Sequence, residues 1–435
     1  MGCQDMVNHY FKLKENNTTI KIEVIAGLTT FLTMSYIIFV NPSILALTGM
    51  NQGAVFAATC LAAAFGSALM GLLANYPIAL APGMGLNAYF TYSVVLGSGN
   101  SWQVGLGAVF ISGFIFLCIS ISPLRSLLMN SIPKTLKVAI VAGIGLFLCL
   151  IGFKNAGIII SKPSTIVGLG DLHNPTTLLA ILGFFLMIGL EALGVIGSII
   201  ISILMITTVS IVMGYSTLNG FFAMPPSLLP TFLQLNLHGA FSLGLITIVF
   251  AFLFVDLFDN TGTLIGIAYR AGFITPSGHL PRIGRALTAA SIAAMVSALL
   301  GTSTTTSYVE STIGVKVGGR TGLMSVVISL LFLLALFFSP LAASIPLYAT
   351  APALVYVACM MARAFLEIDW DDVTEYIPGI ITAITMPLTF SVAEGISFGF
   401  ITYTAIKIIS GKYKELNLAI ILLSIAFIFK YIYFK

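Results

Sequence analysis

Three long stretches of this chain contain no charged residue. Asp, Glu, Lys and Arg are missing from residues 24–124, 192–255 and 321–362. Charged residues make up 8% of the 435 residues and hydrophobic residues 58%, whereas about a quarter of a soluble domain is charged. Because such a chain cannot cover itself with polar surface, we expect an all-α polytopic membrane protein with no separate soluble domain.

Apolar segments of the length that crosses a bilayer, roughly 20 residues, can be placed about fourteen times before residue 410. The third segment, residues 78–96, and the tenth, residues 301–319, are interrupted by Gly, Pro or polar residues. The first and eighth segments also share a pattern, with Asn41 and Asn260 in like places. The order of features therefore repeats after seven spans. Since seven is odd, the second copy should be inverted in the membrane, with the two broken spans meeting at a midplane site opposite the eighth span.

The distribution of cations predicts the orientation. If the N-terminus with Lys12, Lys14 and Lys21 is cytoplasmic, most other cations also fall inside, and the linker before residue 241, which has no Lys or Arg, falls outside. Lys154 and Lys162 are the exceptions. The cations placed inside are Arg125, Lys134, Arg270, Arg282, Arg285, Arg320, Arg363, Lys412 and Lys414. We expect a multi-pass protein of the cell (inner) membrane; the net charge of +4 implies no nucleic-acid partner. Residues 416–433 fit either a further span or a surface helix.

The eighth span, residues 250–268, carries two acids near its middle. A carboxylate at that depth costs about 2.5–3.5 kcal/mol on insertion scales and marks a functional site. Asp256 and Asp259 are three residues apart and share a helix face with Thr263. The alternatives are that Asp259 caps a kink or pairs with a cation such as Lys316, and that Asp256 only supports Asp259.

Glu310 is the second anchor, because it stands where the tenth span is broken. A helix cap is the alternative role. Two carboxylates facing one cavity repel each other, so at least one is expected to carry a proton. Asp259, Glu310 and Asp256 are therefore the candidates for proton coupling. A protonated acid both donates and accepts hydrogen bonds, which suits a flat heterocycle with adjacent N–H and C=O groups.

The third span supplies further candidates. Asn87 offers an amide in the other break. Tyr89 and Phe90 of this span, together with Tyr308 of the tenth, could stack on a planar ring, although packing is the alternative for each. Most hydroxyls of residues 302–307 are expected to bond backbone. The five cysteines form no CxxC pair, so neither a disulfide nor a metal site is expected. Other acids are expected to be solvated: Glu191, Glu367, Asp369, Asp371, Asp372, Glu375 and Glu394.

Three motifs in this order resemble a known family: APGMGLNAYFTY at residues 81–92, VDLFDNTGTLIG at 255–266 and STTTSYVESTIGVKVGGRTGL at 303–323. The chain resembles the AzgA-like hypoxanthine/guanine permeases of the nucleobase–ascorbate transporter (NCS2) family. The resemblance implies a seven-plus-seven inverted repeat of fourteen spans and proton-coupled uptake of a purine base, without a cofactor. Asp259, Glu310 and Asn87 match the family's binding residues, and Thr263 stands where uracil-type relatives carry a histidine.

The resemblance also implies two domains that move against each other. The core comprises residues 22–122 and 241–339, the gate comprises residues 123–213 and 345–410, and residues 416–433 have no counterpart. We expect hypoxanthine or guanine as the purine, with adenine or xanthine as alternatives, and a homodimer as the assembly. The alternatives are a carrier of the same fold for another nucleobase or an inorganic anion, and an intramembrane Mg²⁺-dependent prenyl- or phosphotransferase using Asp256 and Asp259. Two acids facing the cavity disfavour an anion.

Overall fold

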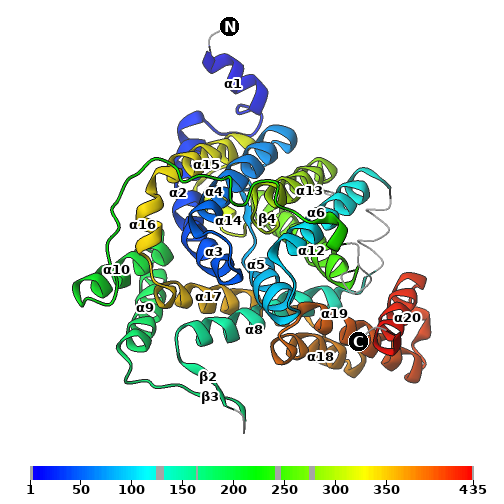
Figure 1. The fold of residues 1–435 in the computed structure, drawn as a ribbon. Coiled ribbons are helices and arrows are strands. Elements are labelled where there is room, and N and C mark those ends of the chain that lie inside the picture. Colours follow the sequence, from blue (N-terminus) through cyan, green and yellow to red (C-terminus); the bar gives the residue numbers. More distant parts are fainter. Residues whose placement is uncertain (1–2, 124–131, 163–164, 241–245, 274–279, 434–435) are drawn as a thin grey trace.

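The computed structural model describes residues 3–123, 132–162, 165–240, 246–273 and 280–433. Ten helices of this part are long and apolar enough to cross a membrane, and Figure 1 shows them as one bundle. Residues 124–131, which include Arg125, and residues 241–245, where the predicted second core segment begins, lie outside the described residues.

The elements follow the predicted spans in order. The first half contains α1 (Cys3–Phe11), α2 (Ile20–Met34), α3 (Ile37–Leu45), η1 (Ala46–Thr48), α4 (Gln52–Leu69), η2 (Met70–Ala74), β1 (Leu80–Pro82), α5 (Met84–Ala88), η3 (Tyr89–Gly97), α6 (Trp102–Ile121), α8 (Lys134–Asn155), β2 (Ile159–Lys162), β3 (Ile166–Leu169), α9 (Pro175–Ala192) and α10 (Ser198–Val212). The second half contains α11 (Leu237–Ala240), α12 (Ile246–Ala271), α13 (Ile283–Leu300), β4 (Thr305–Ser307), α14 (Ser311–Val317), α15 (Gly322–Ala335), η5 (Leu336–Phe338), α16 (Ser339–Ser344), α17 (Leu347–Ala362), η6 (Arg363–Glu367), α18 (Val373–Thr389), α19 (Val392–Ile409), η7 (Tyr413–Glu415) and α20 (Leu418–Tyr433).

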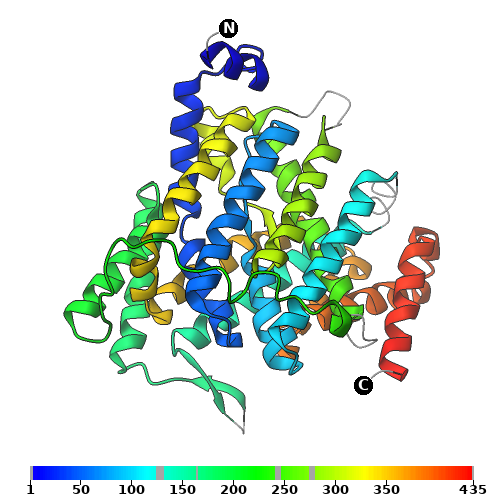
Figure 2. The ribbon, with the colours of Figure 1, turned by 45° about the horizontal axis from the view of Figure 1, so that its top comes forward.

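The helices pack in two groups, which can be followed in Figure 2. In one group, α4 lies against α3, α13 and α15, and α6 lies against α12 and α13. In the other, α8 lies against α17, α18 and α19, and α9 lies against α10 and α17. The groups touch where α12 meets α8 and α19, where α5 meets α8 and where α3 meets α17. That they act as a moving core and gate stays a prediction.

The two broken spans meet inside the bundle. β1 pairs with β4 in antiparallel register, with Leu80 opposite Ser307 and Pro82 opposite Thr305. β4 also contacts α12, and Figure 1 shows it among α12, α13 and α14. The prediction that the broken segments face each other and the eighth span is confirmed. The pairing gives backbone groups at membrane depth the partners that lipid cannot supply.

The first predicted span is interrupted, which the sequence reading missed. Between α2 and α3 the chain turns at Ser35 and Tyr36, and the amides of Ile38 and Phe39 bond the carbonyls three residues back instead of four. Pro42 within α3 has no amide hydrogen for the Ile38 carbonyl, which weakens the regular helix there. The interruption brings Tyr36 inside the bundle, where it is 1% exposed.

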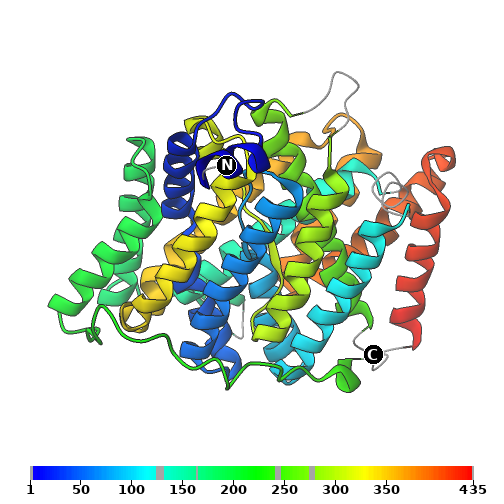
Figure 3. The ribbon, with the colours of Figure 1, turned by 90° about the horizontal axis from the view of Figure 1, so that it is seen from above.

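α20 runs antiparallel to α19 and contacts it along its length. The Lys407 ammonium donates to Glu415 near one end, Thr404 and Ser424 share a hydrogen bond in the middle, and the Lys430 ammonium donates to Glu394 near the other end. Figure 3 shows α20 as the outermost helix on its side, parallel to the neighbouring spans, with the C-terminus at the end opposite α1. The helix has 16 residues, or about 24 Å. α20 therefore lies alongside the spans and not across their ends.

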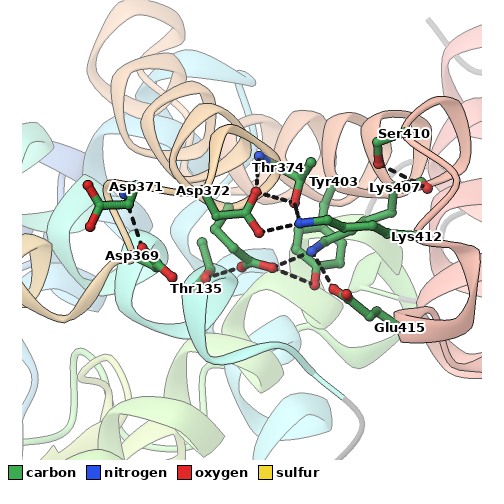
Figure 4. A network of polar contacts seen from close by, with 11 residues as sticks. Thr135, Asp369, Asp371, Asp372, Thr374, Tyr403, Lys407, Ser410, Lys412 and Glu415 are labelled. Carbon is green, nitrogen blue, oxygen red and sulfur yellow. Dashed lines mark hydrogen bonds and ion pairs between the residues drawn. The ribbon is translucent and has the colours of Figure 1, made fainter.

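A network of ion pairs fastens the turn between α19 and α20 (Figure 4). The buried Lys407 ammonium contacts Glu375 at 2.5 Å and Glu415 at 2.6 Å, and Lys412 contacts Asp372 at 2.5 Å. The prediction that Asp372, Glu375 and Glu394 are simply solvated is wrong. Lys412 of the turn pairs with Asp372 at the N-terminus of α18, while Lys407 of α19 and Lys430 of α20 pair with Glu375 and Glu394.

Candidate functional site

Asp256 and Asp259, on the same helix, have different surroundings. Asp256 is buried, and its Oδ2 accepts a hydrogen bond from the Thr304 hydroxyl at 2.7 Å. Its Oδ1 accepts from the Asn260 amide at 3.0 Å. Both oxygens are thus engaged with neighbours that fix α12 against the segment leading into β4. A carboxylate bound in this way serves as a structural acceptor.

Two asparagines hold the ends of the segment that contains β4. The Asn260 carbonyl oxygen accepts from the amide of Ser307 at 2.9 Å and from its hydroxyl at 2.8 Å. The Asn41 amide donates to the Thr302 hydroxyl at 2.8 Å and to Thr59 at 2.7 Å. Several hydroxyls of residues 302–307 therefore take part in buried side-chain and backbone contacts that position this segment.

Asp259 and Glu310 are both partly exposed and interact electrostatically. Both are half-buried, and Asp259 interacts with the Thr306 hydroxyl and electrostatically with Glu310. Glu310 directly precedes α14, and its Oε1 accepts a hydrogen bond from the Tyr36 hydroxyl at 2.8 Å. Among the described residues neither acid makes an ion pair with a Lys or Arg, and Lys316 is exposed. The pair can therefore accept hydrogen bonds from a ligand.

α12 has an exposed face beyond Asp259. Gly262 and Gly266 follow Asp259 on the same helix face, and a side-chain carbon built on either would meet no atom within 4 Å. Thr263 is buried, whereas Gly262 and Gly266 are exposed on this face. The open face runs from Asp259 toward the end of α12 that carries Arg270.

The remaining candidates of the third and tenth spans are engaged in hydrogen bonds or packing within the bundle. Asn87 is buried, and its carbonyl oxygen accepts from the Ser303 hydroxyl while its amide nitrogen has no partner among the described residues. The Tyr308 hydroxyl donates to the Pro82 carbonyl at 2.6 Å. Phe90 packs on α6, where a side chain on Gly105 would come within 2.8 Å of its ring. Tyr89 packs on Phe252 with ring centroids 5.0 Å apart.

The sequence reading missed two residues next to the acids, Tyr36 and Thr306. Thr306 looked like one of several hydroxyls in a polar run. Tyr36 belongs to no motif of the broken spans. A signal was present, since a tyrosine hydroxyl near the middle of an apolar span needs a hydrogen-bond partner.

Contacts between the two helix groups gather around Lys154. The Lys154 ammonium lies 5.8 Å from the ring centre of Tyr92 and 5.7 Å from that of Phe390. The Tyr92 hydroxyl donates to Asn155 at 3.2 Å, and the Ser93 hydroxyl donates to the Phe390 carbonyl. These contacts join η3 to α8 and to the turn between α18 and α19.

The acids do not form a metal-binding cluster. In the described part of the chain, no group of three or more His, Cys, Asp or Glu side chains is arranged to hold a metal ion. Asp256 and Asp259 also point to different partners, Thr304 and Thr306. The two carboxylates are therefore not arranged as a pair that could bind the Mg²⁺ ion of a diphosphate.

Comparison with known proteins identifies the class. Residues 21–398 match the Permease family (Xan_ur_permease), and the chain belongs to that family. It is 46% identical to the adenine permease AdeP of Escherichia coli (strain K12) over 99% of this chain and 97% of that protein. It is 44% identical to the guanine/hypoxanthine permease PbuG of Bacillus subtilis (strain 168) over 98% of this chain and 99% of that protein.

A solved structure shows the fold. The transmembrane domain of the cyanobacterial bicarbonate transporter BicA covers 87% of this chain and 97% of its own, with a TM-score of 0.63 at 16% identity. The predicted resemblance, the all-α membrane fold and the prediction of a transporter instead of an enzyme are confirmed. The transferase alternative is wrong, because the family and its relatives are permeases. The exact number of spans and the inverted repeat stay predictions.

Proposed function

We propose that this permease takes up purine nucleobases, with hypoxanthine and guanine as first candidates and adenine or xanthine as alternatives. The relatives AdeP and PbuG, named for adenine and for guanine/hypoxanthine transport, support this over nearly the whole chain. The observation that carries the proposal is the pair of half-buried acids, Asp259 and Glu310, which interact electrostatically and make no ion pair with a cation among the described residues.

The two acids suit a neutral, flat base. A purine carries N–H donors on its edges, and carboxylate oxygens accept them. The Tyr36 hydroxyl is bound to Glu310 Oε1, and in this proposal Oε2 accepts a hydrogen bond from the base. Asp259 offers the second acceptor, and one proton on the pair relieves repulsion between like charges. We propose that Asp259 and Glu310 bind the base and carry the coupled proton, with Thr263 and Tyr308 at the border of the site.

Asn87, Phe90 and Asp256 take supporting roles in this proposal. Asn87 and Asp256 hold the segment around β4, and Phe90 fills the contact with α6. Asp256 has hydrogen bonds on both oxygens, which disfavours it as the site of proton exchange. No organic cofactor is required, since the proton gradient drives uptake.

The distribution of contacts suits alternating access of a core against a gate. Toward the end of α12 with Arg270, the face of Gly262 and Gly266 is open, while Lys154, Tyr92 and Phe390 close the opposite side. We place the protein in the inner membrane with its N-terminus in the cytoplasm. The end of α12 that carries Arg270 then faces the cytoplasm, so this conformation is open to the inside. Movement of one helix group along the other would then expose the site outward.

Uptake of radiolabelled hypoxanthine by cells that express the chain tests the proposal. Asp259→Ala and Glu310→Gln should abolish uptake without changing the amount of protein in the membrane. Lys162→Ala, on the exposed β2–β3 hairpin, is the matched control and should transport normally. Normal uptake by Asp259→Ala would refute the site.

The same assay identifies the cargo. Unlabelled guanine, adenine, xanthine, uracil and sulfate are added as competitors. Competition by purines alone is expected, because two acids repel an anion. If sulfate competes and the purines do not, the anion carrier suggested by the fold of BicA would be established. Uptake that does not change when a proton ionophore is added would overturn proton coupling.

A further inference from the structure

Tyr36 reaches the candidate site from the interruption of the first span. It stands between α2 and α3, its ring is 1% exposed, and its hydroxyl donates to Glu310 Oε1 at 2.8 Å. The bond links segments 274 positions apart in the sequence. A buried hydroxyl bound to a carboxylate in this way forms a charge-assisted hydrogen bond, which is stronger than a neutral one.

No other aromatic hydroxyl of the site does the same. Tyr308 is two residues before Glu310, but its hydroxyl is bound to the Pro82 carbonyl at 2.6 Å. Thr306 interacts with Asp259. Within the described part of the chain, the Tyr36 hydroxyl is thus the side-chain donor that holds Glu310.

We propose that Tyr36 is a positioning residue for substrate recognition: its hydroxyl holds Glu310 Oε1 so that Oε2 faces the bound base. This inference rests on the proposed function. A glutamate side chain has several rotamers, and fixing one before binding removes an entropic cost that the ligand would otherwise meet. It also sets which edge of the base meets the carboxylate. Tyr36 therefore acts on affinity and on the choice among ligands, through Glu310.

Tyr36→Phe tests this assignment, because it keeps the ring and removes the hydroxyl. Inhibition constants are measured in the uptake assay for hypoxanthine and for its N1-, N7- and N9-methyl derivatives. In the wild type, methylation of the nitrogen that faces Glu310 should weaken binding most. Tyr36→Phe should raise the inhibition constant of hypoxanthine about tenfold. It should also reduce the loss of affinity caused by that one methyl group and leave the losses caused by the other two unchanged.

A structural role for Tyr36 predicts a different pattern. If the hydroxyl only stabilises the turn between α2 and α3, Tyr36→Phe lowers the melting temperature and changes all four inhibition constants by the same factor or by none. That outcome would overturn the inference. Tyr76→Phe is the matched control, since Tyr76 is equally buried and its hydroxyl is bound to the Pro281 carbonyl, away from the acids. It should leave the four constants in their wild-type ratios.

The outcomes also separate this inference from the proposed function. If the wild type takes up no purine, the proposed function fails whatever Tyr36 does. If the wild type takes up purines and Tyr36→Phe keeps the losses of affinity caused by the methyl groups, the proposed function stands and the role of Tyr36 is refuted. Should Tyr36→Phe fail to reach the membrane, Tyr36→Leu, which has no donor, provides the second variant, and an unaltered ligand profile at reduced protein level would count against positioning.

Discussion

Thr304 donates a hydrogen bond to Asp256 Oδ2 at 2.7 Å, so the first acid of α12 fastens the β4 segment to that helix. Asp259, one turn further along, is half-buried and faces Glu310. The pair of acids that looked alike in the sequence is thus divided between a structural bond and an open site.

Substitution of Asp256 is expected to affect stability more than substitution of Asp259. In Asp256→Asn, the oxygen can still accept from Asn260, but the new NH2 group faces the Thr304 hydroxyl, which loses its acceptor. A buried polar group left without a partner costs about 1–3 kcal/mol. Asp259→Asn loses uptake but keeps its stability, because its side chain is partly solvated. Melting temperatures of the two purified variants test this. Equal melting temperatures would contradict the structural role of Asp256.

Gly83 allows the first strand to pass close to Thr306. A side-chain carbon on Gly83 would lie 2.7 Å from the Thr306 hydroxyl oxygen, so Gly83→Ala must displace the group that contacts Asp259. Overpacking of this kind costs about 1–3 kcal/mol, and we expect a lower melting temperature and weaker uptake. Gly266→Ala, where the added carbon meets no atom within 4 Å, is the control and should not lower stability. A stable, fully active Gly83→Ala would show that the strands adjust freely.

Loss of Lys154 should favour opening of the side that it closes. A cation–π contact contributes about 0.5–1 kcal/mol at an exposed site, and Lys154 lies over two rings. In a background without the natural cysteines, Ser93→Cys should react slowly with a membrane-impermeant maleimide added outside. We expect Lys154→Ala to raise that rate by about fivefold, whereas Lys162→Ala leaves it unchanged. An unchanged rate in Lys154→Ala would rule out a closing role.

The Asp372 contact should make stability depend on pH. The Lys412 ammonium, followed by the amide and hydroxyl of Thr374, holds the pKa of Asp372 well below its ordinary value. Since the native pKa is lowered, the stabilisation is fully present above the unfolded pKa of about 3.9 and is lost as the pH falls through the native value. Asp372→Asn should melt lower than the wild type at pH about 7, and the gap should narrow in acid.

A matched variant controls for the loop itself. Asp369 belongs to the same loop and makes no ion pair among the described residues, so Asp369→Asn should melt like the wild type at both pH values. A gap between Asp372→Asn and the wild type that widens in acid would have the wrong sign for a carboxylate with a lowered pKa.

Features that depend on local amino-acid composition could be predicted from the sequence. Apolar segments fixed the helical fold, and the Gly, Pro and polar residues of the third and tenth spans revealed where the helices break. The two broken spans meet as expected, through the pairing of β1 with β4. Asp259 and Glu310 stood out because charges are rare at that depth.

Features that depend on partners distant in sequence could not be predicted. Nothing near Asp256 indicates that the Thr304 hydroxyl binds one of its oxygens. The orientation of Phe90 toward Gly105 and the pairing of Glu375 with Lys407 likewise follow from tertiary packing. Tyr36 escaped notice because periodicity describes a helix face, whereas its place results from a turn between two helices.

The pairing of β1 with β4 bears on how the protein is made in the cell. Leu80 is synthesised long before its partner Ser307, so the nascent first half enters the bilayer with unpaired peptide groups. Those groups must be shielded, by water or by an insertion factor, until the later strand arrives. The halves expressed as separate polypeptides should therefore be degraded when alone and rescue each other when produced together.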